Sequence, residues 1–373
     1  MIQYIFIDDE ADSGAAAFAE ALSDAGPSIA GEKQLCVVAL RPDTLPAVLE
    51  HIAGAKPSGI LMDIALTRTI DGNAQPLAFD GIALAQQLRT LQTRQELPAT
   101  PIVRLSQSAI VSKYVGGDTT SEDLFDEKLS KDDLVDNAGQ QAKILVGLAN
   151  GYPIVRAFVA TDHDPASMAT LLGLDIAFVE QLDSRILLGF QRQGAPAHVF
   201  ARYLIETLLR RAGPLVPTEL LAVRLGVDVE SSGEDWKTLL GRLPGAYSGA
   251  FDSAYPRWWM AAVLAWWQQL PNSPGALQRI TADNRVKFLQ VSQRLAGLQA
   301  IQETADSPGR RYWHICSKSK RPVDPSEGYP LIPEWGHEPW QDPDYLCLEE
   351  AKRDSRNPRL RETERSRLQQ KSA

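Results

Sequence analysis

The stretch IFIDDE, residues 5–10, decides how the first part of this chain folds. Three apolar residues complete a short β-forming run, and three acids, Asp8, Asp9 and Glu10, follow at once. Carboxylates side by side repel one another unless a positive charge lies among them. The stretch therefore predicts a buried strand whose carboxyl end supplies half of a cation site, with Glu10 turned toward solvent.

Similar apolar runs recur over residues 1–150, and each is followed by a helical pattern. The expected strands are QYIFI (3–7), CVVAL (36–40), GILMDIAL (59–66), PIVRLS (101–106) and the short pair Leu124–Phe125. Continuous apolar strands that alternate with helices are typical of a parallel sheet covered on both faces. Residues 1–148 are therefore expected to form an α/β domain of the flavodoxin-like, doubly wound class, with a five-stranded parallel sheet.

The pattern changes after NGYP (150–153). Residues 153–345 are expected to form a mainly α-helical domain, which becomes irregular and Pro-rich from residue 307 onward. The remaining segment, 346–373, is rich in charge and poor in apolar residues. Such a composition is typical of a solvated helix or a disordered tail.

The composition narrows the classes of function. A net charge of −9 gives no overall positive field for nucleic acid or an anionic membrane. The first residues do not resemble a signal peptide, and the longest apolar run, 258–267, is about half the length of a membrane span. Three cysteines in 373 residues do not make a disulfide framework. A cytoplasmic protein with no membrane partner is expected.

Polar side chains stand where the expected strands end. Asp8 and Asp9 follow the first strand, Asp63 lies within the third, Ser106 ends the fourth and Lys128 follows the fifth. The carboxyl ends of parallel strands meet at one edge of a sheet and form its ligand crevice. Three carboxylates at one edge would repel one another unless a hard cation such as Mg²⁺ bound among them. A hydroxyl and a lysine nearby could then hold a phosphoryl group placed on one carboxylate.

With these positions, residues 1–148 resemble the receiver domain of bacterial response regulators. The matching features are the acid pair Asp8-Asp9, Asp63 in the third strand, Asp80-Gly81 before the third helix, Ser106 at the end of the fourth strand, Lys128 after the fifth, and Phe125 where that family carries an aromatic switch residue. The interval from Ser106 to Lys128 is also the usual one in the family. The second half of the chain carries no such resemblance.

The resemblance implies phosphoryl transfer by positioning and charge neutralisation. Asp63 would be the phospho-acceptor and would attack the phosphohistidine of a histidine kinase or a phosphotransfer protein. Mg²⁺, held by Asp8, Asp9 and Asp63, would neutralise the phosphoryl oxygens.

The resemblance also assigns roles to the remaining matched positions. Lys128 would pair with one phosphoryl oxygen, and Ser106 would hydrogen-bond another. Movement of Ser106 toward the phosphate would let Phe125 rotate inward and so change the surface of the last strand and helix.

Three departures from the family pattern bear on phosphorylation. Gln107 stands where the family prefers a very small residue, and it would narrow access to Asp63. Leu129 replaces the proline that usually follows the lysine. The segment 65–77 exceeds the usual loop by roughly ten residues, and a loop of that length suggests a lid or a docking site. The alternative is a degenerate receiver that keeps the fold and is never phosphorylated.

The second half offers two helical candidates. Residues 217–243 suggest a helix-turn-helix with a second helix from about Glu234, but its early residues are acidic and only Lys237 and Arg242 would attract DNA. Residues 256–270 hold four of the eight tryptophans, on one face of an expected helix. A buried core helix explains them better than a face that binds a partner.

A metal site in the second half is also conceivable. His314, Cys316, His337 and Cys347 are of ligand type, but their spacing matches no compact zinc motif. Ordinary packing is the expected explanation.

These observations predict a response-regulator-like protein of a phosphorelay. Its receiver would be phosphorylated on Asp63, and its helical output domain would act through contacts with an unidentified protein partner. One alternative is a DNA-binding transcription regulator that uses residues 217–243. The other is a scaffold that works without phosphorylation.

Overall fold

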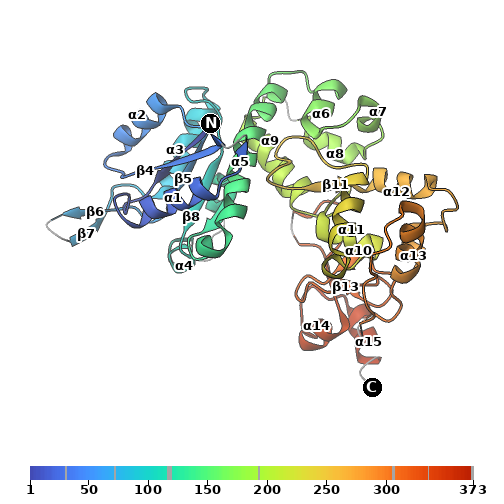
Figure 1. The fold of residues 1–373 in the computed structure, drawn as a ribbon. Helices are drawn as coiled ribbons and strands as arrows, with labels where there is room; N and C mark the ends of the chain where they lie inside the picture. The colour runs from blue at the N-terminus through green and yellow to red at the C-terminus, as the bar shows by residue number, and fades with distance from the viewer. Residues whose placement is uncertain are drawn as a thin grey trace. The chain divides into compact units, whose positions relative to one another are not determined.

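The computed structural model describes residues 1–29, 32–70, 73–115, 120–191, 194–304, 307–334 and 336–370. The chain forms two compact units, each with its own core (Figure 1). Unit 1 comprises Met1–Glu206 and Ser248–Tyr255, and unit 2 comprises Thr207–Tyr247 and Pro256–Ala373. This division differs from the expected boundaries at residues 148 and 153.

Unit 1 is built on a five-stranded sheet in which every pairing is parallel. In spatial order its strands are β4 (Leu35–Leu40), β1 (Ile2–Ile7), β5 (Gly59–Met62), β8 (Ile102–Ser106) and β9 (Glu127–Ser130). Along the chain these are the second, first, third, fourth and fifth strands of the sheet. That is the strand order of flavodoxin-like folds, so the predicted fold class is confirmed.

Helices alternate with these strands along the chain. They are α1 (Gly14–Ala25), α2 (Leu45–Ala55), α3 (Gly81–Thr93), α4 (Ser108–Val115) and α5 (Leu134–Val159). Successive side chains of a strand point to opposite faces of the sheet. Ile5 and Ile7 of β1 accordingly pack in one core with residues of α2 and α3. Tyr4, on the other face, donates a hydrogen bond of 2.7 Å to the carbonyl of Leu145 in α5.

The last strand of the sheet is not where the sequence suggested. The prediction placed it at Leu124–Phe125, but Leu124 ends the 3₁₀ turn η1 (Thr120–Leu124) and Phe125 lies in the core beside η1. β9 begins two residues later and pairs with β8 in the register Val103 with Glu127 through Ser106 with Ser130. The prediction was wrong because EKLS has only one apolar residue, so Leu124–Phe125 looked more like a strand.

Two hairpins are added to the sheet domain. The first joins β2 (Ser28–Ile29) to β3 (Glu32–Lys33), and the second joins β6 (Thr67–Ile70) to β7 (Asn73–Pro76). The second hairpin takes up most of the predicted long loop 65–77, of which residues 71 and 72 lie outside the described residues. The extra length after Asp63 is therefore ordered as antiparallel pairing.

Unit 1 continues past the sheet as a group of helices. These are α6 (Pro165–Leu172), α7 (Ile176–Val179), α8 (Ser184–Gly189), α9 (Ala197–Tyr203) and the π-helical segment η2 (Leu204–Leu209), at which the unit ends. α5 packs against α6 and α9, and the predicted break NGYP (150–153) lies inside α5. The long helix thereby ties these helices to the sheet domain, which explains why unit 1 extends beyond residue 148.

One helix within the described ranges meets the length and composition of a membrane span. It is the segment Asp136–Val159 of α5, and 56% of its apolar window is buried inside the structure. The core helix of a folded domain passes the same test, so the observation is weak evidence for a membrane.

Unit 2 begins with a helical core. Its elements are β10 (Leu215–Pro217), α10 (Thr218–Leu225), α11 (Val229–Arg242), β11 (Arg257–Trp259), α12 (Met260–Gln269), the 3₁₀ turn η3 (Leu277–Arg279) and α13 (Ala282–Gln293). Trp258 and Trp259 belong to a strand that pairs with β10, not to the expected helix. They and Trp267 are buried, so these tryptophans are core residues.

A buried arginine joins the parts of this helical core. The guanidinium of Arg285 in α13 is fully buried and donates hydrogen bonds to the carbonyls of Arg224 at 2.7 Å, Tyr312 at 2.8 Å and Leu277 at 3.0 Å. Burial lowers the pKa of Arg285 to about 10. These bonds satisfy carbonyls near the end of α10, at the start of η3 and in a loop, while Nη2 of Arg285 has no hydrogen-bond partner among the described residues.

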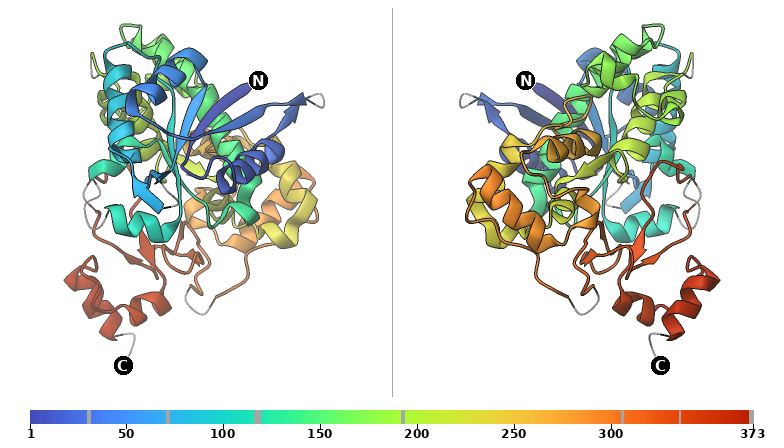
Figure 2. Two further views of the ribbon diagram at one scale, coloured as in Figure 1. Left: turned by 90° about the vertical axis from the view of Figure 1, so that its left-hand side faces the viewer. Right: turned by 90° about the vertical axis from the view of Figure 1, so that its right-hand side faces the viewer.

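The C-terminal part of unit 2 is ordered and packed. Its short strands are β12 (His314–Ile315), β13 (Pro322–Val323), β14 (Tyr329–Pro330) and β15 (Tyr345–Leu346), followed by α14 (Leu348–Arg353) and α15 (Glu362–Gln370). The last two helices lie side by side at this end of the chain (Figure 2). Leu360 and Leu368 are buried in a core with Cys316 and Tyr329. The described part of the predicted tail, residues 346–370, is therefore not a solvated tail, since a few well-spaced apolar residues anchor it.

The start of α3 offers a test of how closely the sheet and helix approach. A Cβ atom at Gly81 would lie 2.1 Å from the carbonyl oxygen of Asp63. Gly81→Ala is therefore expected to lower the free energy of unfolding by about 1–3 kcal/mol or more. Gly139→Ala in α5, where the Cβ atom would meet nothing within 4 Å, is expected to raise it by up to about 1 kcal/mol. Urea denaturation of both variants measures the two changes in the free energy of unfolding. Equal changes would contradict the close approach of Asp63 to Gly81.

Candidate functional site

Asp8 is the first polar residue at the carboxyl end of β1, and it is fully buried. Its backbone N–H donates to the carbonyl of Leu40 at 3.2 Å, which continues the pairing with β4. Its carboxylate accepts hydrogen bonds from the N–H of Glu10 at 2.9 Å and from Nζ of Lys131 at 2.6 Å. Burial raises the pKa of Asp8, and the hydrogen bond from Lys131 opposes that rise.

Asp63 directly follows β5 and is almost fully buried. Its N–H donates to the carbonyl of Ile7 at 3.0 Å, so it stands beside the end of β1. One carboxylate oxygen accepts from Oγ of Ser106 and from the N–H of Ile64, both at 2.6 Å. The other oxygen accepts from Nζ of Lys131. A hydroxyl and an ammonium thus hold the two oxygens of one carboxylate.

Lys131 follows β9, and its ammonium lies between Asp8 and Asp63. Its backbone N–H donates to the carbonyl of Ser106 at 3.2 Å, which fixes where the side chain starts. The ammonium also lies 5.7 Å from the ring centre of Phe6. Burial alone would lower the pKa of Lys131, but Asp63 and Asp8 outweigh it and the pKa is raised. Asp8, Asp63 and Lys131 form a buried group of charges that we call the ion triad.

In the ion triad, Lys131 occupies the position beside the acids that was expected for Lys128. Lys128 pairs with Glu122 at 2.9 Å, and Arg104, opposite Lys128 in the strand register, pairs with the same carboxylate at 2.8 Å. Lys128 lies inside β9 and does not reach the acids, whereas Lys131 is the first residue beyond the strand. The three-residue error follows from the misplaced strand. Extending the sheet register from Ser106 to Ser130 is the signal that would have identified Lys131.

Phe125, the expected switch residue, lies in the core of unit 1. Phe125 is buried among core residues of α3 and β8. Its role as an aromatic switch residue stays a prediction.

Asp9, the third expected metal ligand, is turned to a different partner. Its carboxylate accepts hydrogen bonds from the hydroxyl of Thr67 and from the N–H of Thr67 at 3.2 Å, at the start of β6. Carboxylate oxygens are suitable Mg²⁺ ligands, and Asp8 and Asp63 converge on one point, where Lys131 lies. Within the described parts of the chain, no three Asp, Glu, His or Cys residues are arranged to hold a metal ion. The arrangement thus supplies two of the three expected ligands, and the partner of the third, Thr67, was not foreseen.

Asp80 and Gly81, two further positions that match the family pattern, lie at the start of α3 next to Asp63. Asp80 caps α3 by accepting from the N–H of Ala83 at 2.8 Å, and Gly81 permits the close approach to Asp63 described above. Gln107 is exposed next to Ser106. The side chain of Asp63 keeps 9% of its surface accessible.

The alternative sites in unit 2 gain little from the structure. The thiol of Cys316 accepts from the N–H of Cys347 at 3.3 Å, but His314 stacks on Tyr345 and His337 donates to the carbonyl of Asp342. These residues form no three-ligand metal group within the described ranges.

The helix-turn-helix candidate is also explained by packing. α10 is almost entirely buried, and Gly226 turns the chain in the left-handed conformation. α11 begins at Val229, earlier than the expected Glu234. Its basic residues are engaged, since Lys237 pairs with Glu234 at 2.6 Å and Arg242 donates to a carbonyl at 2.8 Å.

Comparison with solved structures finds response regulators and receiver domains. A response regulator from Chloroflexus aurantiacus is 18% identical with a TM-score of 0.27, and the match covers 39% of this chain and 98% of that one. The receiver domain of NarL from Mycobacterium tuberculosis is 22% identical with a TM-score of 0.24, over 38% of this chain and 91% of that one. NtrX from Brucella abortus is 17% identical with a TM-score of 0.25, over 44% and 35%. No protein-family model and no curated protein matches the sequence.

Removal of Lys131 tests the ion triad. Lys131→Met leaves buried carboxylates without a cation, and the expected loss is roughly 3–5 kcal/mol in the free energy of unfolding at about pH 7. The pKa of Asp8 is already raised and would rise further without Lys131, so the folded variant takes up a proton more readily than the unfolded one. Protonation then favours the folded state, and the deficit shrinks as the pH falls toward about 4. Denaturation at several pH values measures it.

Lys128→Met is the matched control for this experiment. Lys128 and Glu122 are partly exposed, so the loss is expected to stay within about 1 kcal/mol. Equal deficits in the two variants at neutral pH would contradict the assignment of the buried cation to Lys131.

Proposed function

We propose that this chain is a response-regulator-like signalling protein that accepts a phosphoryl group on Asp63 and acts through protein contacts of unit 2. One observation carries the proposal. Asp63 is held at the carboxyl end of a parallel sheet by a hydroxyl and an ammonium, with the carboxylate of Asp8 beside it. A histidine kinase or a phosphotransfer protein would be the phosphoryl donor, and a cytoplasmic location suits that partner.

The chemistry uses groups that already contact Asp63. A carboxylate oxygen attacks the phosphorus of a phosphohistidine, the P–N bond breaks, and the imidazole of the donor keeps the electron pair and takes up a proton. An acyl phosphate remains on Asp63. Lys131 and Ser106, which now bind the two carboxylate oxygens, would bind phosphoryl oxygens instead.

Mg²⁺ would be held by Asp8 and Asp63, and by Asp9 once Thr67 releases it. When bound, the ion would neutralise negative charge on the phosphoryl oxygens. Lys131 and the ion would then share the charge of the carboxylates, because both bind the same two side chains.

Phosphorylation on Asp63 is tested with Mg²⁺ and a small phosphodonor. Mass spectrometry is expected to locate an acyl phosphate on Asp63, and Asp63→Asn is expected to remove it. Lys131→Ala is expected to slow phosphorylation at least about 10-fold, since a charged hydrogen bond contributes roughly 1.5–3 kcal/mol. Lys128→Ala should react at the normal rate, because its amine pairs with Glu122.

The results also separate the proposal from its alternatives. An unmodified Asp63, with wild type and Asp63→Asn indistinguishable in partner capture, would favour the phosphorylation-independent scaffold. Equal rates in the Lys131 and Lys128 variants would show that neither amine acts on the phosphoryl group.

The hydrogen bonds from Thr67 to Asp9 generate a separate prediction. Thr67→Val removes the hydroxyl donor with little change in shape and leaves Asp9 only the backbone N–H of residue 67, so that Asp9 joins Asp8 and Asp63 more readily. The affinity for Mg²⁺, measured by calorimetry on the apo protein, is expected to rise several-fold. Thr90→Val, which removes a hydroxyl that donates to Gln86 in α3, is the matched control and is expected to change nothing. Weaker binding in Thr67→Val would mean that Thr67 positions Asp9 for the metal.

A further inference from the structure

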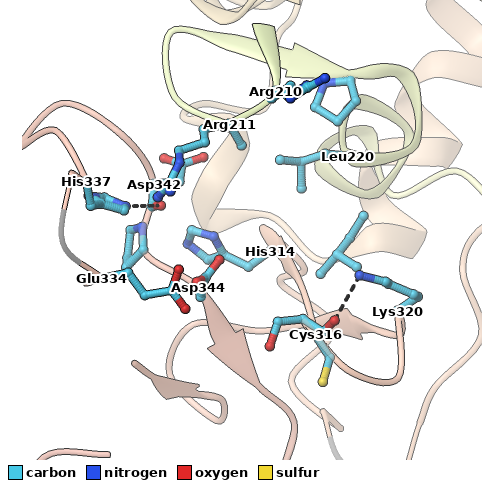
Figure 3. A pocket seen from close by; sticks show the side chains of 15 residues that line it. Arg210, Arg211, Leu220, His314, Cys316, Lys320, Glu334, His337, Asp342 and Asp344 are labelled. Carbon is cyan, nitrogen blue, oxygen red and sulfur yellow. Dashed lines mark hydrogen bonds between the residues drawn. The ribbon is translucent and has the colours of Figure 1, made fainter. Parts of the chain in front are cut away.

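Unit 2 contains a pocket that the proposed function does not use. Its volume is about 410 Å³, within the range of small-molecule sites. Figure 3 shows its residues, which come from the segment before β10, from β12 and the turn after it, and from the loop that ends at β15. The lining includes the cationic side chains Arg210, Arg211 and Lys320 and the imidazoles of His314 and His337.

Among the described residues, the side-chain nitrogens of Arg211 and His314 have no hydrogen-bond partner. Arg211 is half-buried and has no hydrogen bond or ion pair with the described residues. His314 is 9% exposed and stacks on Tyr345 at 4.1 Å, but within the described ranges its ring nitrogens bind nothing. Burial lowers the pKa of His314 to about 4, so the ring is neutral and offers one N–H donor. Groups of this kind are satisfied by water or by a ligand.

The acids that line the pocket pair with arginine side chains. Glu334 and Asp344 both pair with Arg359 at 2.7 Å, and Asp342 pairs with Arg224. Neither of these two arginines lines the pocket. Arg224 and Arg359 therefore offset part of the negative charge of these three carboxylates, which pair with neither Arg211 nor Lys320 among the described residues.

We propose that this pocket binds a phosphate monoester of about mononucleotide size. Arg211, His314 and Lys320 approach from different sides (Figure 3), which suits a tetrahedral phosphate with several oxygens better than a planar carboxylate. Lys320 now donates to the carbonyl of Ser317 at 2.8 Å and is exposed, so it can turn to a ligand. Pro217, Leu220 and Ile315 form an apolar wall for the uncharged part.

The inference concerns unit 2 alone and does not depend on phosphorylation of Asp63. Adenosine 5′-monophosphate and inorganic phosphate are the probes, added to the full-length protein in a calorimeter, with adenosine for comparison. The nucleotide is expected to bind at least about 10-fold more tightly than adenosine, because a charge-assisted hydrogen bond contributes roughly 1.5–3 kcal/mol. Asp63→Asn is expected to leave this binding unchanged, which separates the pocket from the site in unit 1.

Variants decide where the nucleotide binds. Arg211→Ala removes an unpaired side chain, so the protein should remain folded while its affinity falls at least about 10-fold. His314→Phe keeps the ring stacked on Tyr345 and loses the N–H, with a smaller loss of affinity. Arg361→Ala, at an exposed arginine outside the pocket, is the matched control and should bind normally.

Three results would overturn the proposal. They are no binding of either phosphate probe in the millimolar range, equal binding of the nucleotide and adenosine, and equal affinity in Arg211→Ala and Arg361→Ala.

Discussion

Buried charge at both ends of β9 is the constraint on which unit 1 depends. Asp126, just before the strand, is buried and pairs with Arg89 of α3 at 2.8 Å, and Tyr152 of α5 donates to it at 2.7 Å. Lys131, just after the strand, is buried between Asp8 and Asp63. Removing one member of a buried ion pair costs several kcal/mol. A shift of β9 by even one residue would therefore leave buried charges unpaired at both of its ends. The register of a nearly polar strand is therefore set by ion pairs and not by an apolar pattern.

The same constraint explains how acids accumulate at one edge of the sheet. A single ammonium compensates two carboxylates, and the hairpin inserted after β5 provides Thr67 for the third acid. Asp8 and Asp63 thereby share one cation, while Asp9 accepts hydrogen bonds from Thr67. The insertion that looked like a long loop thus has a defined contact with the site.

The parts of unit 1 that the sequence could predict are those governed by local patterns. Apolar runs such as residues 3–7 and 59–66 located β1 and β5, and the acids that follow the first run and interrupt the second located Asp8 and Asp63. The position of Lys131 could not be read in this way, because EKLSK offers two lysines three residues apart and only the pairing with β8 distinguishes them. The contact between Thr67 and Asp9 spans 58 residues, and no local pattern encodes it.

In unit 2, contacts between distant segments of the chain matter more than local sequence patterns. Its helices follow apolar periodicity, but the pocket joins Arg211 to His314 from segments about one hundred residues apart in the chain. The two histidines and two cysteines drew attention as potential metal ligands, yet His314 is placed by stacking on Tyr345 and His337 by its bond to the Asp342 carbonyl. Residue type alone therefore singled out these residues without indicating which contacts place them. The acids that line the pocket pair with Arg224 and Arg359, which do not line it, and that arrangement depends on the fold.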